Sequence, residues 1–204
     1  WKSSGSDDSL FSLSVRAVSE NSDGLWIGRA GFREPPTLFY AEDIGKWQEQ
    51  DWQQLFAGLR VVRRLQHLYD ASNVVEMRLE ATSADGTEVP FTCLRGGSDS
   101  DGHLPTLVYA YGGFGIPLLP NYNATIGAAW LERGGQYVEV NLRGGGEFGP
   151  DWERAGRFAT GRLKAYEDLE AVADELLHRG LAEPGRLALM GRSNGGLLVA
   201  NQIV

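Results

Sequence analysis

The stretch of sequence that decides the fold runs Met190-Gly191-Arg192-Ser193-Asn194-Gly195-Gly196. It matches the pattern G-x-S-x-G, in which a serine stands on a sharp turn between a strand and a helix. Residues 186–190 form a short apolar run that predicts a buried strand, and residues 195–202 predict a helix. Glycine fits the positions two residues before and after the serine, because the backbone comes too close there for a Cβ atom. We therefore predict a nucleophile elbow, with Ser193 as the nucleophile.

A simpler interpretation is a loop that only joins a strand to a helix. G-x-S-x-G arises by chance in many chains, so the letters alone leave the two interpretations even. The predicted strand before the motif and the predicted helix after it favour the elbow. In an elbow the backbone amide of Asn194 lies at the first turn of the helix and points to the place where an oxyanion forms.

The region around the motif, from about residue 74 onward, alternates strands and helices. A hairpin with Asp85-Gly86 at its centre joins the first two strands. The clearest helix, residues 165–179, carries its apolar side chains on one stripe and ends at Gly180. This order predicts an α/β fold with a mostly parallel sheet. The expected strands cover residues 74–79, 88–94, 106–111, 137–142 and 186–190, and the expected helices cover 124–133, 165–179 and 195–202.

Residues 1–68 have a different pattern, with short extended pieces separated by turns. Residues 10–15 alternate apolar and polar side chains, as a half-buried strand does. Residues 25–28 and 37–40 predict further strands. We expect an antiparallel sheet here, although these strands are too few to close a fold alone.

Two glycine-rich segments each follow a predicted strand. Tyr109-Ala110-Tyr111-Gly112-Gly113-Phe114-Gly115 stands where α/β-hydrolases carry their second oxyanion donor, and a tyrosine hydroxyl could serve as well as an amide. Taken alone, a packing tyrosine before a turn explains this segment better. The second segment covers residues 141–149 and lacks the G-x-G-x-x-G of a dinucleotide site. Its glycines are explained by a tight structural loop.

Taken together, three motifs resemble the prolyl oligopeptidase family of serine peptidases. They are Tyr111-Gly112-Gly113-Phe114, Arg143-Gly144-Gly145-Gly146-Glu147-Phe148-Gly149 and Gly191-Arg192-Ser193-Asn194-Gly195-Gly196-Leu197-Leu198. Asp151-Trp152, Glu167-Asp168-Leu169 and the hairpin at residues 83–87 fit the same pattern. The resemblance covers residues 74–204 well and residues 1–68 loosely. It implies a truncated α/β-hydrolase fold over residues 69–204, preceded at residues 1–68 by antiparallel strands of a partial β-propeller.

The resemblance also implies roles for single residues. Ser193 resembles the nucleophile, the Asn194 amide and the Tyr111 hydroxyl resemble the two oxyanion donors, and Phe114 resembles a wall of the pocket for the residue before the scissile bond. Tyr-Gly-Gly-Phe and Ser-Asn-Gly-Gly favour the prolyl oligopeptidase branch over the oligopeptidase B branch. Two departures put the proline preference in doubt. Arg192 stands where the family commonly has Gly, and residues 161–166 differ from the usual residues.

The catalytic base is absent from the expected place. In this fold the order along the chain is Ser, then Asp or Glu, then His. The eleven residues after Ser193 contain neither Asp nor His, and the three histidines, His67, His103 and His178, all precede it. Each of these histidines is explained better by a surface or packing role than by catalysis. We therefore expect the chain to be the middle of a larger enzyme, with the triad Asp and His beyond it.

Composition narrows the function classes. Acidic residues outnumber basic ones by 27 to 19, so a nucleic acid is not expected as a partner. No apolar run is long enough to span a membrane. The single cysteine, Cys93, excludes an intrachain disulfide and lies in an apolar run, where we expect it to be buried. The low number of cysteines suits a reducing compartment, so we expect a cytoplasmic location. The sequence starts at Trp1, so no targeting segment can be judged.

The sequence thus predicts a serine peptidase of the prolyl oligopeptidase type. We expect it to cleave short peptides after proline through an acyl-enzyme on Ser193, without a metal or cofactor. An esterase or acylaminoacyl peptidase of the same fold fits the same chemistry. A non-catalytic propeller-hydrolase protein that serves as an interaction module is the alternative from another class. The sequence does not give the oligomeric state.

Overall fold

A computed structural model describes residues 9–43, 52–96 and 104–203. They fall into two compact units. The first unit consists of the residues up to Leu68 together with Leu119–Ala124, and the second consists of Tyr69–Leu118 and the residues from Thr125 onward. Of the described residues, no helix is both long and apolar enough to cross a membrane.

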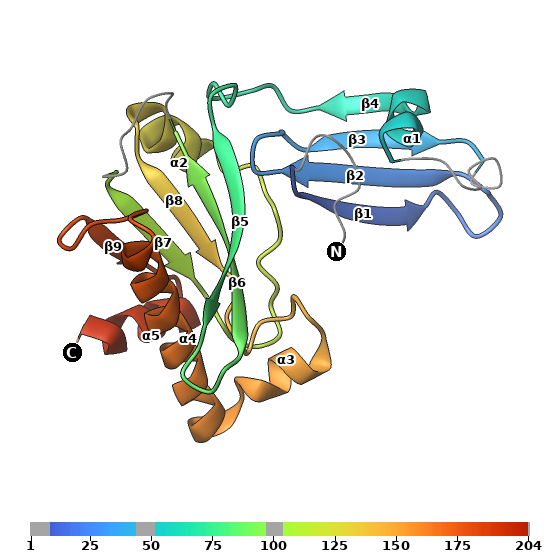
Figure 1. Cartoon of the computed structure of the whole chain (residues 1–204). Coiled ribbons are helices and arrows are strands. Elements are labelled where there is room, and N and C mark those ends of the chain that lie inside the picture. Colours follow the sequence, from blue (N-terminus) through green and yellow to red (C-terminus); the bar gives the residue numbers. More distant parts are fainter. Residues whose placement is uncertain (1–8, 44–51, 97–103, 204) are drawn as a thin grey trace. The chain divides into compact units, whose positions relative to one another are not determined.

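The first unit is a four-stranded antiparallel sheet in the order β1-β2-β3-β4 (Figure 1). The strands are β1 (Phe11–Ala17), β2 (Leu25–Gly31), β3 (Thr37–Ala41) and β4 (Arg60–Arg64), and helix α1 (Trp52–Gly58) precedes β4. The expected antiparallel strands are confirmed. Both β4 and α1 were missed, because β4 carries three arginines and is exposed throughout, so its sequence lacks the alternation of a half-buried strand.

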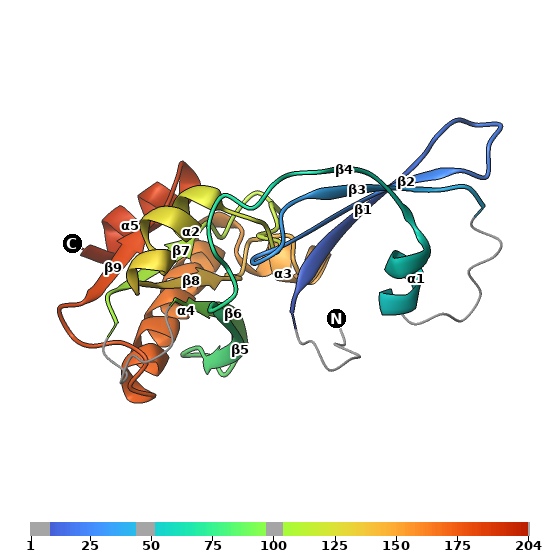
Figure 2. The ribbon, with the colours of Figure 1, turned by 90° about the horizontal axis from the view of Figure 1, so that it is seen from above.

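The core of the first unit is a small apolar cluster on one face of the sheet. Its buried members are Ile27, Phe39, Ala41 and Phe56. The ring of Phe56 lies 5.1 Å from that of Phe39, which attaches α1 to this face. Figure 2 shows α1 on one side of the sheet of β1 to β4. These few aromatic and aliphatic contacts hold the helix on the sheet.

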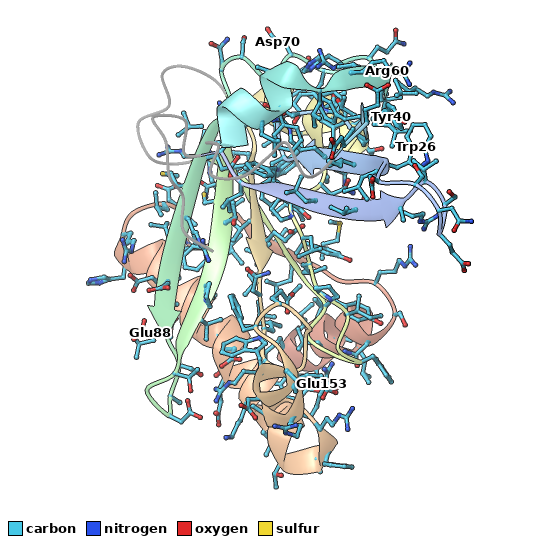
Figure 3. The ribbon with its side chains drawn as sticks, turned by 90° about the vertical axis from the view of Figure 1, so that its right-hand side faces the viewer. Trp26, Tyr40, Arg60, Asp70, Glu88 and Glu153 are labelled. Atoms are coloured by element: carbon cyan, nitrogen blue, oxygen red, sulfur yellow. The ribbon has the colours of Figure 1, made fainter. Side chains whose placement is uncertain are left out.

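A row of three side chains crosses neighbouring strands of the same sheet. Trp26 of β2 pairs with Tyr40 of β3, with ring centroids 5.2 Å apart. The guanidinium of Arg60 on β4 lies 4.7 Å from the Tyr40 ring (Figure 3). Such cross-strand pairs stabilise a sheet by a few tenths of a kcal/mol to about 1 kcal/mol each.

The second unit is a five-stranded sheet in the order β5-β6-β8-β7-β9, with helices attached. The strands are β5 (Val75–Thr82), β6 (Glu88–Arg95), β7 (Thr106–Ala110), β8 (Gln136–Val140) and β9 (Leu187–Met190). The helices are α2 (Ala124–Ala129), the short 3-10 helix η2 (Leu131–Arg133), α3 (Pro150–Ala155), α4 (Phe158–His178) and α5 (Asn194–Ile203).

The prediction of a mostly parallel sheet was wrong for half of the pairings. Strand β7 pairs in parallel with β8 and β9, whereas β6 pairs antiparallel with β5 and β8. The Asp85-Gly86 turn produces the first antiparallel pair, with Gly86 at φ 83°. The ten residues between Arg95 and Thr106 are too few for a parallel crossover. The sheet is therefore mixed.

Two predicted helices also need correction, and one helix was missed. The predicted helix 124–133 is interrupted at Trp130, which leaves helical geometry and donates its indole N–H to the Gln136 carbonyl at 2.7 Å. Helix α4 begins at Phe158 rather than residue 165, because its first residues are exposed and give no apolar stripe. Helix α3 was missed, since it is six residues long and buries no side chain fully.

One continuous apolar core joins the sheet of the second unit to α4 and α5. Leu169, Val172 and Leu176 of α4 and Leu198 of α5 are at most 1% exposed within this core. Val108, Val138 and Val140 are among the strand residues that they meet. Cys93 is also part of this core, so its predicted burial is confirmed, and burial raises the pKa of its thiol to about 12.

Candidate active site

The turn around Ser193 joins β9 to α5. Ser193 is exposed and has φ 53°, in the left-handed region that residues with a side chain rarely adopt. A Cβ on Gly191 would lie 2.1 Å from the carbonyl oxygen of Gly195, and a Cβ on Gly195 would lie 2.2 Å from that of Ala110. Glycine is therefore required at both positions. The backbone reverses within a few residues, and the amide of Leu197 already donates to the Ser193 carbonyl at 3.1 Å.

The loop after β7 lies beside this turn. The side-chain amide of Asn194 donates to the carbonyls of Tyr111, at 2.9 Å, and Gly112, at 3.2 Å. A Cβ on Gly113 would lie 2.2 Å from the same Asn194 nitrogen, so the loop and the turn are in direct contact. The structure thus brings together Ser193, Asn194 and the Tyr111 backbone. The sequence analysis considered only the Asn194 backbone amide and missed the part played by its side chain.

Phe114 lies in the same loop and is 80% exposed. Its φ of 57° is in the left-handed region, as is that of Ser193. Backbone strain of this kind collects at functional sites, where the surroundings hold it in place. The ring is available to a ligand, and its role as a pocket wall stays a prediction.

A second loop, Arg143–Gly149, supports the first. The Gly115 amide donates to the Gly144 carbonyl at 3.0 Å. A Cβ on Gly144 would lie 2.9 Å from the carbonyl oxygen of Gly112, and one on Gly146 would lie 2.2 Å from that of Gly115. The glycines that the sequence analysis assigned to a tight structural loop therefore allow two backbones to pack against each other.

A buried ion pair anchors this second loop. Arg143 is 2% exposed and donates to Asp168 of α4, which is fully buried, with 2.6 Å between Nη2 and Oδ1. It also donates to Asp85 at 2.5 Å and to Ser83 at 3.0 Å. The hydrogen bond from Arg143 holds the pKa of Asp85 well below its usual range. One guanidinium thus ties the loop to α4 and to the β5–β6 hairpin.

Two further carboxyl groups lie on and beside β8. Burial raises the pKa of Glu139 to about 8, and the charge of Glu147 acts in the same direction. Glu139 lies opposite Tyr109 of β7, and its carboxyl is 3.5 Å from the Tyr137 hydroxyl. Glu147 accepts a hydrogen bond from the Leu118 amide at 2.8 Å, and burial raises its pKa as well. The sequence analysis did not single out either carboxyl.

The described histidines do not supply a base to Ser193. The ring of His67 meets that of Tyr122 within the first unit, at 6.2 Å between centroids. His178 is exposed at the last residue of α4, and His103 lies outside the described residues. Within residues 9–43, 52–96 and 104–203, no hydrogen bond joins Ser193 to a histidine. The same residues contain no cluster of three metal-ligating side chains.

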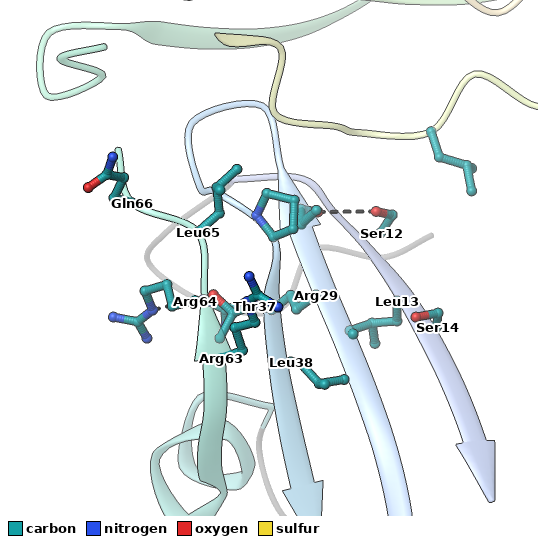
Figure 4. Close-up of a pocket in the computed structure, with 14 residues that line it drawn as sticks. Ser12, Leu13, Ser14, Arg29, Thr37, Leu38, Arg63, Arg64, Leu65 and Gln66 are labelled. Atoms are coloured by element: carbon teal, nitrogen blue, oxygen red, sulfur yellow. Dashed lines mark hydrogen bonds between the residues drawn. The ribbon is translucent and has the colours of Figure 1, made fainter. Parts of the chain in front are cut away.

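An open groove lies on the first sheet. It has a volume of about 820 Å³ and is lined by Ser12, Ser14, Leu38 and Arg63, among others (Figure 4). Most of its lining residues belong to β1, β2, β3 and β4. The residues that carry the candidate chemistry are not part of its lining.

A serine on a strand–turn–helix, beside a second glycine loop at the end of a neighbouring parallel strand, is the arrangement that defines the class of serine hydrolases with an elbow. Comparison with known proteins agrees with this class. Residues 122–203 match the prolyl oligopeptidase family. The chain belongs to that family.

Individual relatives show how much of such a protein the chain covers. It is 40% identical over 193 residues to an uncharacterized peptidase, y4nA, of Sinorhizobium fredii, covering 94% of this chain and 25% of that protein. It is 35% identical over 177 residues to a prolyl endopeptidase of Elizabethkingia miricola, covering 86% of this chain and 23% of the relative. Oligopeptidase B of Trypanosoma brucei has a similar structure, with a TM-score of 0.82 and 26% identity, over 95% of this chain and 26% of that one. The chain spans about a quarter of the length of these proteins.

Proposed function

We propose that the protein is a serine peptidase that cleaves short peptides after proline through an acyl-enzyme on Ser193. The observation that supports this most directly is the pair of hydrogen bonds from the Asn194 side chain to the Tyr111 and Gly112 carbonyls. They hold the turn that exposes Ser193 against the loop that carries Tyr111. A nucleophile and two oxyanion donors need this proximity to act on one carbonyl group.

In the proposed mechanism, the Ser193 hydroxyl attacks the carbonyl carbon of the scissile peptide bond. A histidine outside the described residues takes the hydroxyl proton and then passes it to the leaving amine. The backbone N–H of Asn194 and the hydroxyl of Tyr111 donate to the oxyanion, each contributing about 3 kcal/mol to the transition state. Water then hydrolyses the acyl-enzyme and regenerates Ser193.

The proposal extends to the architecture of the whole protein. We assign residues 69–204 to the first part of an α/β-hydrolase domain. The strand order β6-β8-β7-β9 supports this, because it puts β9, which leads to Ser193, next to β7, which leads to Tyr111. We assign residues 1–68 to the end of a β-propeller, which the four-stranded antiparallel sheet supports. Residues 119–124 group with the first unit although they fall within the proposed hydrolase domain.

The proposed preference for proline has separate support. One relative is named a prolyl endopeptidase, and the exposed Phe114 ring lies in the loop beside the elbow. An aromatic ring is a suitable wall for the flat, apolar side chain of proline. The structural similarity to an oligopeptidase B makes the substrate test necessary.

The first test is labelling of the protein that carries this chain, at its full length, by a fluorophosphonate. We expect the wild type to be labelled and Ser193→Ala to be unlabelled and at least about 10⁴-fold less active, since the nucleophile is lost. Ser12→Ala in the first unit is the control and should label normally. A wild-type protein that folds but does not label would contradict the proposal and favour the non-catalytic interaction module.

A second test compares three kinds of substrate: an amide after Gly-Pro, an acetylated peptide and a simple ester. We expect the highest kcat/KM on the proline amide. A preference for the acetylated peptide or the ester would replace the proposal by an acylaminoacyl peptidase or an esterase. Phe114→Ala should lower kcat/KM for the proline amide more than for the ester, about 10-fold, if its ring contacts proline.

A further inference from the structure

Arg162 joins the two segments that carry the proposed oxyanion donors. It is the fifth residue of α4 and is half-buried. Its Nη1 donates to the carbonyl of Gly112 at 2.7 Å, and its Nη2 donates to the carbonyl of Asn194 at 3.0 Å. Its guanidinium also lies 5.5 Å from the ring of Tyr166, one turn further along the helix. The sequence analysis noted Arg162 only as part of a segment that departs from the family.

These two carbonyls belong to particular places in the site. Gly112 directly follows Tyr111, and Asn194 directly follows Ser193. The Asn194 side chain already bonds to the Tyr111 and Gly112 carbonyls, so the two segments are connected twice, once directly and once through Arg162. The Gly112 carbonyl accepts from both connections. Neither segment can move relative to the other without breaking at least one of these bonds.

The position of the charge indicates more than a packing role. Arg162 places a positive guanidinium at the N-terminal turn of α5, where the helix dipole disfavours a cation. Helix α4 does not need this contact for its anchorage, because Ala165, Leu169 and Val172 are at most 1% exposed in the core. Asp168 fixes the same helix to Arg143. The contacts of Arg162 therefore serve the Gly112 and Asn194 segments rather than α4.

We infer that Arg162 is a positioning residue that sets the distance between the Tyr111 hydroxyl and the Asn194 amide. The inference rests on the proposed function. Both donors must reach one oxygen atom, and displacements of about 0.5 Å are enough to weaken such a site. A planar guanidinium with two parallel donors fixes two acceptors at once, whereas an ammonium group does not. Arg162 thus acts on the transition state through the backbone and does not touch substrate.

The test uses the full-length protein with Arg162→Met and Arg162→Lys, and Arg179→Ala as the matched control. Arg179 lies at the C-terminal end of α4, is exposed and pairs with Glu175. We expect Arg162→Met to lower kcat about 10- to 100-fold while KM changes less than about threefold, since transition-state stabilisation is lost and ground-state binding is kept. Arg162→Lys should lie between Arg162→Met and the wild type, and Arg179→Ala should match the wild type.

A second readout separates positioning from a general loss of structure. A peptide aldehyde forms a tetrahedral adduct whose oxygen sits between the two donors, so its affinity should fall by the same factor as kcat. Affinity for an uncleaved peptide, measured in the Ser193→Ala background, should stay within about twofold. Equal losses in both affinities would overturn the inference. A kcat of Arg162→Met within twofold of the wild type would also overturn it. If Arg162→Met does not fold, full activity of Arg162→Lys would overturn it instead.

Failure of the proposed function gives a different result. In that case the wild type itself is neither labelled nor active, and the inference falls with it. If the wild type is active and Arg162→Met has the same kcat, the inference about Arg162 is wrong and the proposed function stands. The two outcomes are therefore distinguished by the wild-type measurement.

Discussion

The two units of the chain bury different kinds of side chain. The core of the β1–β4 unit is a small apolar cluster, with Phe56 of α1 set against Phe39. The unit of β5 to β9 has a larger apolar core and also buries Arg143 and Asp168, which are 2% and 0% exposed. Among the described residues, buried charges occur in this second unit alone.

The difference shows what buried charge does here. An apolar cluster is sufficient to keep a sheet and a helix together, because the hydrophobic effect has no preferred direction. A loop that must keep one geometry beside Ser193 needs directional contacts, and Arg143 supplies them. Desolvation offsets much of the gain from a buried pair, so the pair contributes position more than net stability.

The substitution Arg143→Met has the largest expected effect and tests the role of the buried charges in the second unit. It leaves the Asp168 carboxylate buried without its partner, so we expect the free energy of unfolding to fall by about 3–5 kcal/mol. Urea denaturation measures this loss. Arg154→Ala, which removes an exposed pair with Asp151, is the control and should cost no more than about 0.5 kcal/mol.

A double substitution sharpens the same comparison. Arg143→Met with Asp168→Leu removes both charges together, so most of the stability should return while activity stays low. Low stability in the double variant as well would show that the pair holds the fold itself, and the distinction between position and stability would fail.

The apolar side of the comparison is tested by Phe56→Ala. It removes the ring that attaches α1 to the first sheet, so we expect a loss of about 3 kcal/mol and faster hydrogen exchange in β2 and β3. Leu38→Ala, at a residue that is 36% exposed, is the control and should have a much smaller effect. Unchanged exchange in β2 and β3 would show that the cluster is not the main support of this sheet.

The smallest expected effect concerns pH. In the folded protein, burial raises the pKa of Glu139 from its ordinary value of about 4.5 to about 8. Between these values the folded protein keeps a proton that the unfolded chain has released, so the free energy of unfolding should fall as pH rises from about 4.5 to about 8. We expect Glu139→Gln to lack this pH-dependent loss of stability. Urea titrations of both proteins at pH 5 and pH 8.5 measure the free energy of unfolding. An equal change between the two pH values in wild type and Glu139→Gln would contradict the assignment.

The sequence was most informative where a pattern is enforced by local geometry. Ser193 and its glycines, Gly191 and Gly195, could be placed on a strand–turn–helix from their spacing together with the predicted strand before them and the predicted helix after them. The structure gives the reason for the glycines, because a Cβ at either position would meet backbone. The Asp85-Gly86 hairpin was predictable for the same reason, since Gly86 has φ 83°. Alternating apolar residues predicted the first strand of the first sheet, and turn signals in the sequence marked the starts of the next two.

What the sequence did not reveal depends on partners far away in the chain. Arg162 gives no local signal, because its acceptors at Gly112 and Asn194 are 50 and 32 residues away. The antiparallel pairing of β6 with β8 depends on which strand becomes its neighbour. The exposed strand β4 carries no apolar pattern at all. Long-range contacts of this kind decide geometry without leaving a periodicity.

The side chain of Asn194 carries one more consequence. Its side-chain nitrogen donates to both the Tyr111 and the Gly112 carbonyls, so its N–H donors are used within the protein. An aspartate of nearly the same shape would place a carboxylate oxygen against the Tyr111 and Gly112 carbonyl oxygens. The repulsion would separate the Ser193 turn from the loop after β7. The choice of amide over acid at this position therefore serves the contact between the Ser193 turn and the loop after β7.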